Sequence, residues 1–271
     1  MTSRRVPFPP ERKLVLDTLH LGRDKPMMHA LVELDVTRAR HLLDEHRART
    51  GEPFSQTAFL LVTLGRTLAR HPEVHARRDW RGRLVQFDVV DATTIVEIEV
   101  DGRRFPYAHV VRGLERRDAG EVHDELRAVA RRGFATTSPG KRLATRAMLA
   151  TPAFARRTVY RGLLGFADLA QRHTGSVLVS AVGMFGEGAG FGMSAPGLHD
   201  LSVIVGGRVA RAANGAPTQS LCVTVAANHA IVDGAPFARF VGDWSRHVAA
   251  AEGLEETLAR RSEADGGARI V

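Results

Sequence analysis

The stretch that decides the fold is NHAIVDGAPFARF, residues 228–240. It follows residues 221–227, in which Leu, Val and Val alternate with Cys, Thr and Ala. That alternation predicts a buried β-strand, and the apolar spacing after the stretch predicts a helix over 236–250. His229 and Asp233 therefore fall, four residues apart, in the turn that joins the strand to the helix.

This placement is typical of a catalytic histidine. A neutral imidazole held at a strand end in one tautomer suits a general base. Asp233 follows three apolar residues, where a carboxylate is expected to be buried and paired, because burying a lone charge is costly. Gly234 is expected to supply a backbone angle that other residues resist. The alternative, which the spacing leaves open, is a core histidine with Asp233 as a helix cap.

The rest of the chain mixes strands with helices, which indicates an α/β protein. Residues 1–12, with three prolines, are expected to be irregular, and residues 1–24 to form an N-terminal arm. Expected strands cover 30–36, 84–90, 94–100, 107–111, 176–182, 201–205 and 221–227. Expected helices cover 37–46, 55–70 (capped by Ser55), 118–131 (with an Asp118/Glu121 capping box) and 236–250, with weaker helical periodicity at 143–149 and 159–169.

Composition narrows the classes of function. The 271 residues are 44% hydrophobic and 25% charged, as in a globular protein. No apolar run approaches the roughly 18 residues of a membrane span, and no secretory signal opens the chain. A single cysteine, Cys222, cannot form an internal disulfide, so a cytoplasmic protein is expected. The net charge of +8 comes mostly from scattered Arg, without a nucleic-acid module, so no nucleic-acid partner is expected.

Residues 229–234, His-Ala-Ile-Val-Asp-Gly, are similar to the HxxxDG motif of the chloramphenicol acetyltransferase superfamily, which includes the catalytic domain of 2-oxoacid dehydrogenase acyltransferases. Four longer stretches resemble those acyltransferases in the same order: 53–79, 93–113, 175–186 and 223–240. The resemblance covers about residues 25–250. It implies a chloramphenicol-acetyltransferase-like two-layer sandwich, with a mixed sheet and helices packed on one face.

The resemblance also implies a chemistry. His229 would act as general base on an acceptor that attacks the thioester of acyl-CoA, with no acyl-enzyme, no permanently bound cofactor and no metal. Ser180 would donate to the oxyanion. Asp233 would be structural and paired with an Arg, with Arg12 and Arg23 among the candidates.

Two neighbours of this set, Asn228 and Gly234, would be structural residues near the site. The active site would lie between the subunits of a homotrimer. The residues that bind CoA stay unassigned.

Several features favour a stand-alone enzyme. Asn228 and Ala230 flank the histidine, where the dehydrogenase acyltransferases usually have Asp and Arg. Residues 132–172 look longer than the matching stretch, are Arg-rich, and are expected to form a solvated helical hairpin over the active-site mouth, with binding of acidic phospholipid as the alternative. The catalytic domain is expected over 25–252, and no lipoyl domain is expected before it. The tail, 253–271, is polar and expected to fray, which favours a trimer over a larger core.

The favoured function is therefore transfer of acetyl, or another short acyl group, from CoA to a small hydroxylated acceptor, for example the hydroxymethyl group of a tetronate natural product. One alternative is a dihydrolipoyl acyltransferase that works with separate lipoyl partners. The other is a non-catalytic scaffold, which the presence of both His229 and Ser180 disfavours.

Two further patterns give weaker indications of a metal or ligand site. His71 and His75 have the spacing of a helical metal pair, but Pro72 lies between them and no third ligand is evident, so no metal is expected. The glycines of 183–192 do not form GxGxxG and are expected to form a turn that approaches a ligand.

Overall fold

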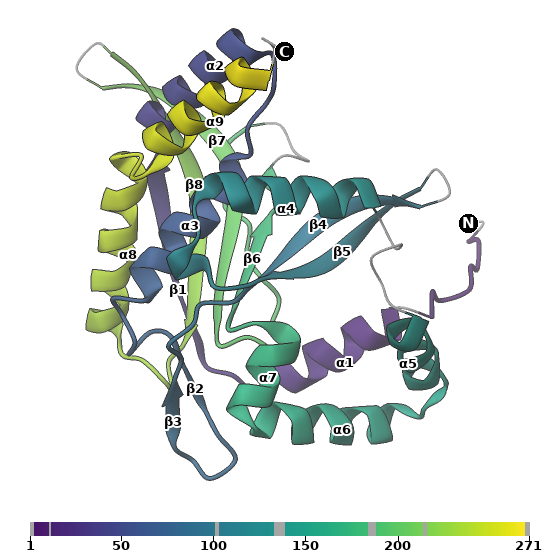
Figure 1. Ribbon diagram of the computed structural model, residues 1–271. Helices are drawn as coiled ribbons and strands as arrows, with labels where there is room; N and C mark the ends of the chain where they lie inside the picture. The colour runs from purple at the N-terminus through teal and green to yellow at the C-terminus, as the bar shows by residue number, and fades with distance from the viewer. Residues whose placement is uncertain are drawn as a thin grey trace.

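A mixed six-stranded β-sheet organises the protein, with the strand order β1-β8-β7-β6-β4-β5 (Figure 1). The structure is a computed structural model that describes residues 3–10, 12–100, 103–132, 139–183, 188–213 and 216–268. The sheet consists of β1 (Met27–Asp35), β4 (Ala92–Val100), β5 (Arg103–Val111), β6 (Val177–Ala181), β7 (Leu201–Ala213) and β8 (Ala216–Asn228). β6 pairs in parallel with β4 and β7, and the other pairs are antiparallel. A separate hairpin joins β2 (Ala76–Arg78) to β3 (Leu84–Gln86).

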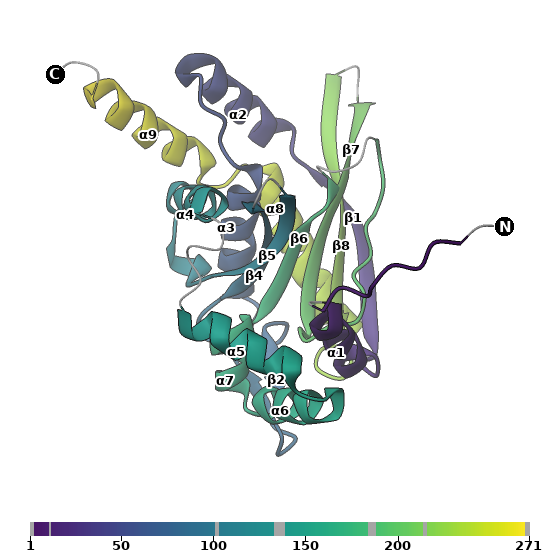
Figure 2. The same cartoon turned by 90° about the vertical axis from the view of Figure 1, so that its right-hand side faces the viewer.

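Helices form the second layer. Helices α3, α4 and α8 cover one face of the sheet, and α1, α5, α6 and α7 gather at the lower end of Figures 1 and 2. The helices are α1 (Arg12–Gly22), α2 (Thr37–Thr50), α3 (Gln56–Leu68), α4 (Ala119–Arg132), α5 (Pro139–Ala150), α6 (Ala153–Gly165), α7 (Ala167–Thr174), α8 (Gly234–Ala249), α9 (Leu254–Ala268) and a short 3-10 helix, Leu114–Arg116. The expected fold class, a mixed sheet with helices on one face, is confirmed. Among the described residues, no helix combines the length and apolarity needed to cross a membrane.

The core lies between the sheet and helices α3 and α8. The predicted apolar stripe of α8 is confirmed, since all five of its members are buried: Phe237, Phe240, Val241, Trp244 and Val248. The indole Nε1 of Trp244 donates to the Thr63 hydroxyl of α3 (3.3 Å), so the one polar atom of this side chain is satisfied inside the core.

The predicted helix caps at Ser55 and at Asp118/Glu121 are present. Thr37, also expected to cap a helix, is instead the first residue of α2, and the residue before it makes no side-chain cap bond. The Ser55 hydroxyl accepts a hydrogen bond from the Ala58 N–H (3.2 Å) at the start of α3. Asp118 and Glu121 bond each other's backbone N–H groups, at 2.9 and 3.2 Å, which is the capping box of α4. These caps satisfy backbone groups that a helix start otherwise leaves without partners.

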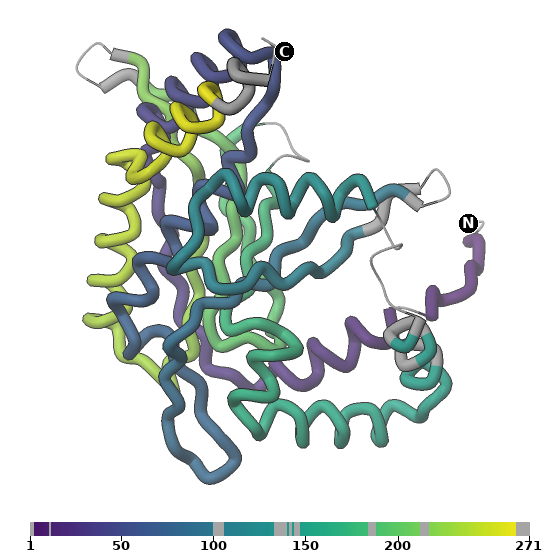
Figure 3. The backbone as a smooth tube through the Cα atoms, in the orientation of Figure 1, coloured from purple at the N-terminus to yellow at the C-terminus, as the bar shows by residue number. Residues whose placement is uncertain are grey.

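Two terminal segments differ from expectation. The arm contains α1, which is anchored because the buried carboxylate of Asp17 binds Arg156 (2.6 Å) and Arg157 (2.9 Å) of α6. The tail, expected to fray, instead forms α9 over 254–268, while residues 269–271 lie outside the described part. Leu254 and Leu258 are 0% and 3% exposed and belong to the core. Two leucines one turn apart are enough to dock an otherwise polar helix. Figure 3 shows α9 following α8 back toward α2.

Leu258→Ala tests whether α9 is part of the folded unit. The substitution should lower the free energy of unfolding by about 2–4 kcal/mol, because it leaves a cavity in a packed site. Urea unfolding measures this. The matched control is Leu143→Ala on α5, where the side chain is 70% exposed and the change should stay within about 0.5 kcal/mol. Equal small effects at both positions would mean that α9 frays after all.

Candidate functional site

His229 lies where β8 turns into α8, in a well-anchored backbone. Its N–H donates to the carbonyl of Pro26 (2.8 Å), just before β1, and the N–H groups of Ile231 and Val232 bond the carbonyl of Asn228 (2.9 and 3.3 Å). The side chain of His229 is 54% exposed. The turn therefore holds its backbone firmly and leaves the imidazole accessible.

A buried carboxylate, Asp200, holds this turn to the sheet. The side chain is 11% exposed. Its Oδ1 accepts from the amide of Asn228 (2.9 Å) and from Nζ of Lys25 (2.9 Å), and its Oδ2 accepts from Nε of Arg77 (3.0 Å). The amide oxygen of Asn228 in turn accepts from the N–H of Ala230 (3.0 Å). Asn228, expected to be structural, therefore links the carboxylate to both sides of His229.

The positive charges of Lys25 and Arg77 keep Asp200 ionised. Burial by itself raises the pKa of the Asp200 carboxyl, but the charges of Lys25 and Arg77 and the hydrogen bond from Asn228 outweigh it, so the pKa lies below its ordinary value. Burial also lowers the pKa of Lys25. The cluster was not predicted, because its members are distant in sequence and no local spacing connects them.

Asp233 corrects an expectation. Its carboxylate was expected to be buried against an Arg, but it is 87% exposed and no Arg pairs with it in the described part of the chain. Arg23 pairs with Asp24 instead (3.3 Å). The Nδ1 of His229 lies 3.8 Å from Oδ1 of Asp233, beyond hydrogen-bond distance. Asp233 occupies the N-cap position of α8 without a side-chain cap bond, so the alternative of a capping role also fails.

Gly234 also differs from expectation. It begins α8 without the positive φ that favours glycine. A Cβ built on it would meet no atom within 4 Å. Within one chain, neither Gly234 nor Asp233 has a structural reason for its residue type.

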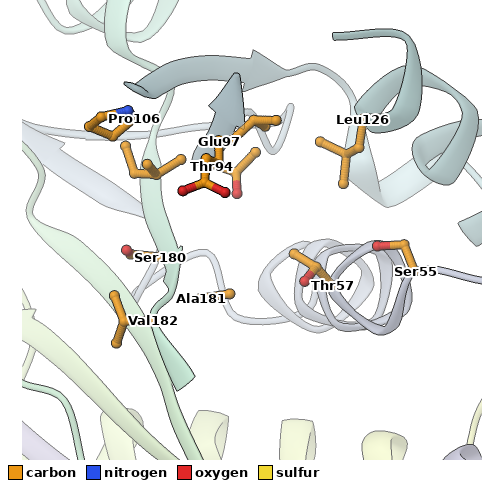
Figure 4. A pocket seen from close by; sticks show the side chains of 11 residues that line it. Ser55, Thr57, Thr94, Glu97, Pro106, Leu126, Ser180, Ala181 and Val182 are labelled. Atoms are coloured by element: carbon orange, nitrogen blue, oxygen red, sulfur yellow. The ribbon is translucent and has the colours of Figure 1, made fainter. Parts of the chain in front are cut away.

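Ser180, on β6, lines the rim of a cavity of about 540 Å³. The cavity lies among β4, β5, β6, the start of α3 and the middle of α4, and Figure 4 shows Ser180, Thr94 and Thr57 around it. Its walls are mostly apolar, with hydroxyl groups from Ser55, Thr57, Thr94 and Ser180 and one carboxylate, Glu97.

Ser180 and His229 do not meet within one chain. Ser180 is opposite Ile204 on β7, and Ile204 is opposite Thr224 on β8, five residues before His229. With about 3.3 Å per residue along a strand and about 4.8 Å between strands, their α-carbons lie roughly 19 Å apart. Figure 1 agrees, because the connection from β8 to α8 lies at the lower end of the sheet.

The weaker sequence signals have structural explanations. His71 bonds Asp243 (2.8 Å), and His75 bonds the carbonyl of Phe87 (3.1 Å) and the Ser176 hydroxyl (2.6 Å). No group of three or more metal-ligating side chains occurs among the described residues.

Among the glycines of 183–192, of which 184–187 lie outside the described residues, Gly183 packs closely against β7. A Cβ on Gly183 would lie 1.7 Å from the carbonyl oxygen of Gly206, and a Cβ on Gly206 would lie 2.2 Å from the carbonyl oxygen of Gly190. Gly183 and Gly206 therefore permit close backbone approach. The expected turn that approaches a ligand stays a prediction.

The Arg-rich segment 132–172 is a set of three helices, α5–α7, rather than the expected hairpin; residues 133–138 lie outside the described part. Helix α6 packs on α1.

Comparison with solved structures identifies the fold. A dihydrolipoamide acetyltransferase of Azotobacter vinelandii, studied for the catalytic roles of a serine, a histidine and an asparagine four residues after that histidine, aligns with a TM-score of 0.67 and 16% identity over 92% of each chain. A probable dihydrolipoamide acetyltransferase of Listeria monocytogenes (TM-score 0.64, 17% identity) aligns over 91% of this chain and 94% of its own. A truncated catalytic core of the 2-oxoacid dehydrogenase complex from Thermoplasma acidophilum (0.65, 17%) aligns over 92% and 100%.

The fold is therefore the chloramphenicol-acetyltransferase-like fold that the resemblance implied. At such low identity these alignments establish the fold alone. No protein-family model and no curated protein sequence matches the chain.

Asp200→Asn tests the buried cluster. The substitution leaves Lys25 and Arg77 buried without a counter-charge, which should cost about 3–5 kcal/mol of unfolding free energy at pH 7. Because the folded-state pKa of Asp200 is depressed, its contribution is present above the unfolded pKa of about 3.9 and is lost as pH falls through the lower folded pKa. Urea unfolding of both proteins at several pH values should show that their difference in unfolding free energy disappears below about pH 4. A difference that does not depend on pH would contradict the ionised cluster.

Proposed function

We propose that the protein is an acyl-CoA-dependent acyltransferase that moves acetyl, or another short acyl group, to a hydroxyl of a small acceptor. The observation that carries this proposal is the order Ser180, His229, Asp233 on this fold, with His229 accessible in a firmly held turn. The same order, and the same spacing of four after the histidine, occurs in the residues studied in the Azotobacter vinelandii enzyme, where an asparagine stands at the position of Asp233.

The proposed reaction needs no acyl-enzyme. The imidazole of His229 takes the proton of the acceptor hydroxyl as the oxygen attacks the thioester carbonyl. The Ser180 hydroxyl donates to the oxygen that becomes negative in the tetrahedral intermediate. When the C–S bond breaks, the imidazolium returns its proton to the leaving thiolate. The products are the acyl ester and free CoA.

In this proposal two chains build each site, and the protein is a homotrimer. Because roughly 19 Å separates Ser180 from His229 in one chain, both can act on one substrate only when they come from different chains. The trimer itself is what the resemblance implies. Exposed groups near the expected interface support it. Leu31 on the edge strand β1 is 54% exposed, and the Asp233 carboxylate beside His229 is 87% exposed. Burial against a neighbouring chain would cover both.

The cavity at Ser180 supports a small acceptor. Its volume of about 540 Å³ falls within the range of about 300–1,000 Å³ that small-molecule sites occupy. Its mostly apolar walls favour an acceptor with an apolar body that carries the reacting hydroxyl. A cavity of this kind favours an enzyme over a scaffold, and it suits a dihydrolipoyl group as well as a small hydroxylated acceptor.

His229→Ala tests the base. Turnover should fall by about two to four orders of magnitude, because general-base assistance is lost. CoA release from acetyl-CoA over a panel of hydroxylated acceptors measures it. His41→Ala, which alters a histidine that is 72% exposed on α2, is the matched control. Turnover of the His229 variant within threefold of wild type, with unchanged thermal unfolding, would remove His229 from the mechanism.

Mixing two inactive proteins tests the shared site. After subunit exchange between His229→Ala and Ser180→Ala chains, about a quarter of the sites in a cyclic trimer combine one intact His229 with one intact Ser180. Activity should therefore return to at most about a quarter of wild type. Light scattering should show a trimer throughout. Exchanged trimers without activity, or a fully active monomer, would disprove the two-chain site.

A further inference from the structure

A second cavity, of about 410 Å³, lies beside the turn that carries His229. The turn contributes Asn228, Ala230 and Ile231 to its wall. The remaining wall comes from the end of α1, from β2 and from α6, and Figure 1 shows these elements at the end of the sheet where β8 passes into α8. None of its lining residues belongs to the cavity at Ser180.

Basic side chains outnumber carboxylates in this wall. They are Lys25, Arg77, Arg78 and Arg161, against Asp24 and Asp200. Asp200 is already bound by Lys25 (2.9 Å) and Arg77 (3.0 Å). Asp24 lies on the surface, 82% exposed, and pairs with Arg23 (3.3 Å). Both carboxylates are therefore occupied, and positive charge remains.

Arg78 and Arg161 are the basic side chains of this wall that bind neither carboxylate. Neither has an ion pair or a side-chain hydrogen bond in the described part of the chain. Other arginines of α6 are in use, because Arg156 and Arg157 bind Asp17 of α1 at 2.6 and 2.9 Å. This anchor fixes α6 against α1, and Arg161, one turn further along the helix, is left to face the cavity.

Two guanidinium groups at one concave site favour a phosphorylated ligand. The planar fork of Arg matches phosphate oxygens in pairs, and the group stays charged at any working pH. The thioester donor of the proposed reaction carries a diphosphate and a ribose phosphate at the end remote from the acyl group. We propose that the cavity beside His229 binds the phosphate-bearing end of the acyl donor, with Arg78 and Arg161 as the groups that pair with phosphate.

This inference rests on the proposed function. It assigns part of the donor site to a segment in which this chain differs from the dehydrogenase acyltransferases. Arg161 lies within residues 132–172, the segment that looks longer than the matching stretch of the dehydrogenase acyltransferases. The segment was expected to lie over the active-site mouth, and α6 lines this cavity together with Ala230. The donor would then approach His229 from the α6 side, while the acceptor occupies the cavity at Ser180 of the neighbouring chain.

Calorimetric titration tests the site without relying on turnover. The probes are CoA, dephospho-CoA, 4′-phosphopantetheine and pantetheine, which has no phosphate. The Arg78→Ala/Arg161→Ala double variant should raise the Kd for CoA about tenfold to hundredfold. The ratio of the pantetheine Kd to the CoA Kd should fall by a similar factor. Arg49→Ala, an exposed arginine on the remote helix α2, is the matched control and should bind CoA as wild type does.

The outcomes separate the phosphate site from the proposed function. An unchanged CoA Kd in the double variant, or an equal loss of pantetheine affinity, would overturn the site while leaving the acyltransferase proposal standing. A CoA Kd that depends on the arginines, together with no transfer to any acceptor, would support the site and count against the function. If the double variant weakens 4′-phosphopantetheine binding as much as CoA binding, the arginines recognise the single phosphate attached to pantetheine, which a donor bound to a carrier protein also has. If only CoA and dephospho-CoA bind more weakly, the arginines recognise the diphosphate of free CoA.

In steady-state assays the double variant should raise KM for acetyl-CoA more than it lowers kcat. Phosphates remote from the thioester do not change during acyl transfer, so their contacts stabilise substrate and transition state equally. A loss confined to kcat would contradict a phosphate-binding role. Arg161→Lys, which keeps the charge without the fork, should recover part of the lost affinity, and a Kd equal to that of Arg161→Ala would argue against a charge contact.

Discussion

The ionised carboxylate of Asp200 is the interaction on which the geometry around His229 depends. It binds a lysine ahead of β1, an arginine on β2 and the last residue of β8, so three separate parts of the chain meet at one buried charge. Charges in a protein interior are stable only when such partners are complete. The turn that carries His229 is therefore held by a group that has no direct contact with the candidate reaction.

How much of this was predictable from sequence depends on the distance between interacting residues. The stripe of α8 and the caps of α3 and α4 follow from spacings of three to five residues, and they are confirmed. The Asp200 cluster joins residues that are 28 and 123 positions apart, which no local pattern connects. The order of α9 was missed because its charged composition obscured Leu254 and Leu258, two leucines one turn apart. The exposure of Asp233 was missed because its burial was inferred from the three apolar residues before it, whereas the turn leaves the carboxylate in solvent.

The two cavities divide the proposed chemistry between different surfaces. The cavity at Ser180 has mostly apolar walls, while the one beside His229 contains two guanidinium groups that have no ion pair or side-chain hydrogen bond among the described residues. The apolar walls favour an acceptor that fits their shape, and the two arginines favour the phosphates of the acyl donor. Each cavity would therefore disfavour the substrate of the other. Asp17 of α1 supports this division, since it binds the neighbouring arginines of α6 and leaves Arg161 facing the cavity.

The pairing of β1 with β8 has a consequence for how the chain folds during synthesis. Met27 is opposite Asn228, so the first strand of the sheet finds its partner only after about two hundred further residues have been made. β6 pairs with β4, which is synthesised long before it, and with β7, which is synthesised after it. Such non-local pairing is slow, because the chain loses entropy before the contacts form. A nascent chain that has left the ribosome without β8 exposes an unpaired apolar strand, and this stage is where we expect chaperones to bind.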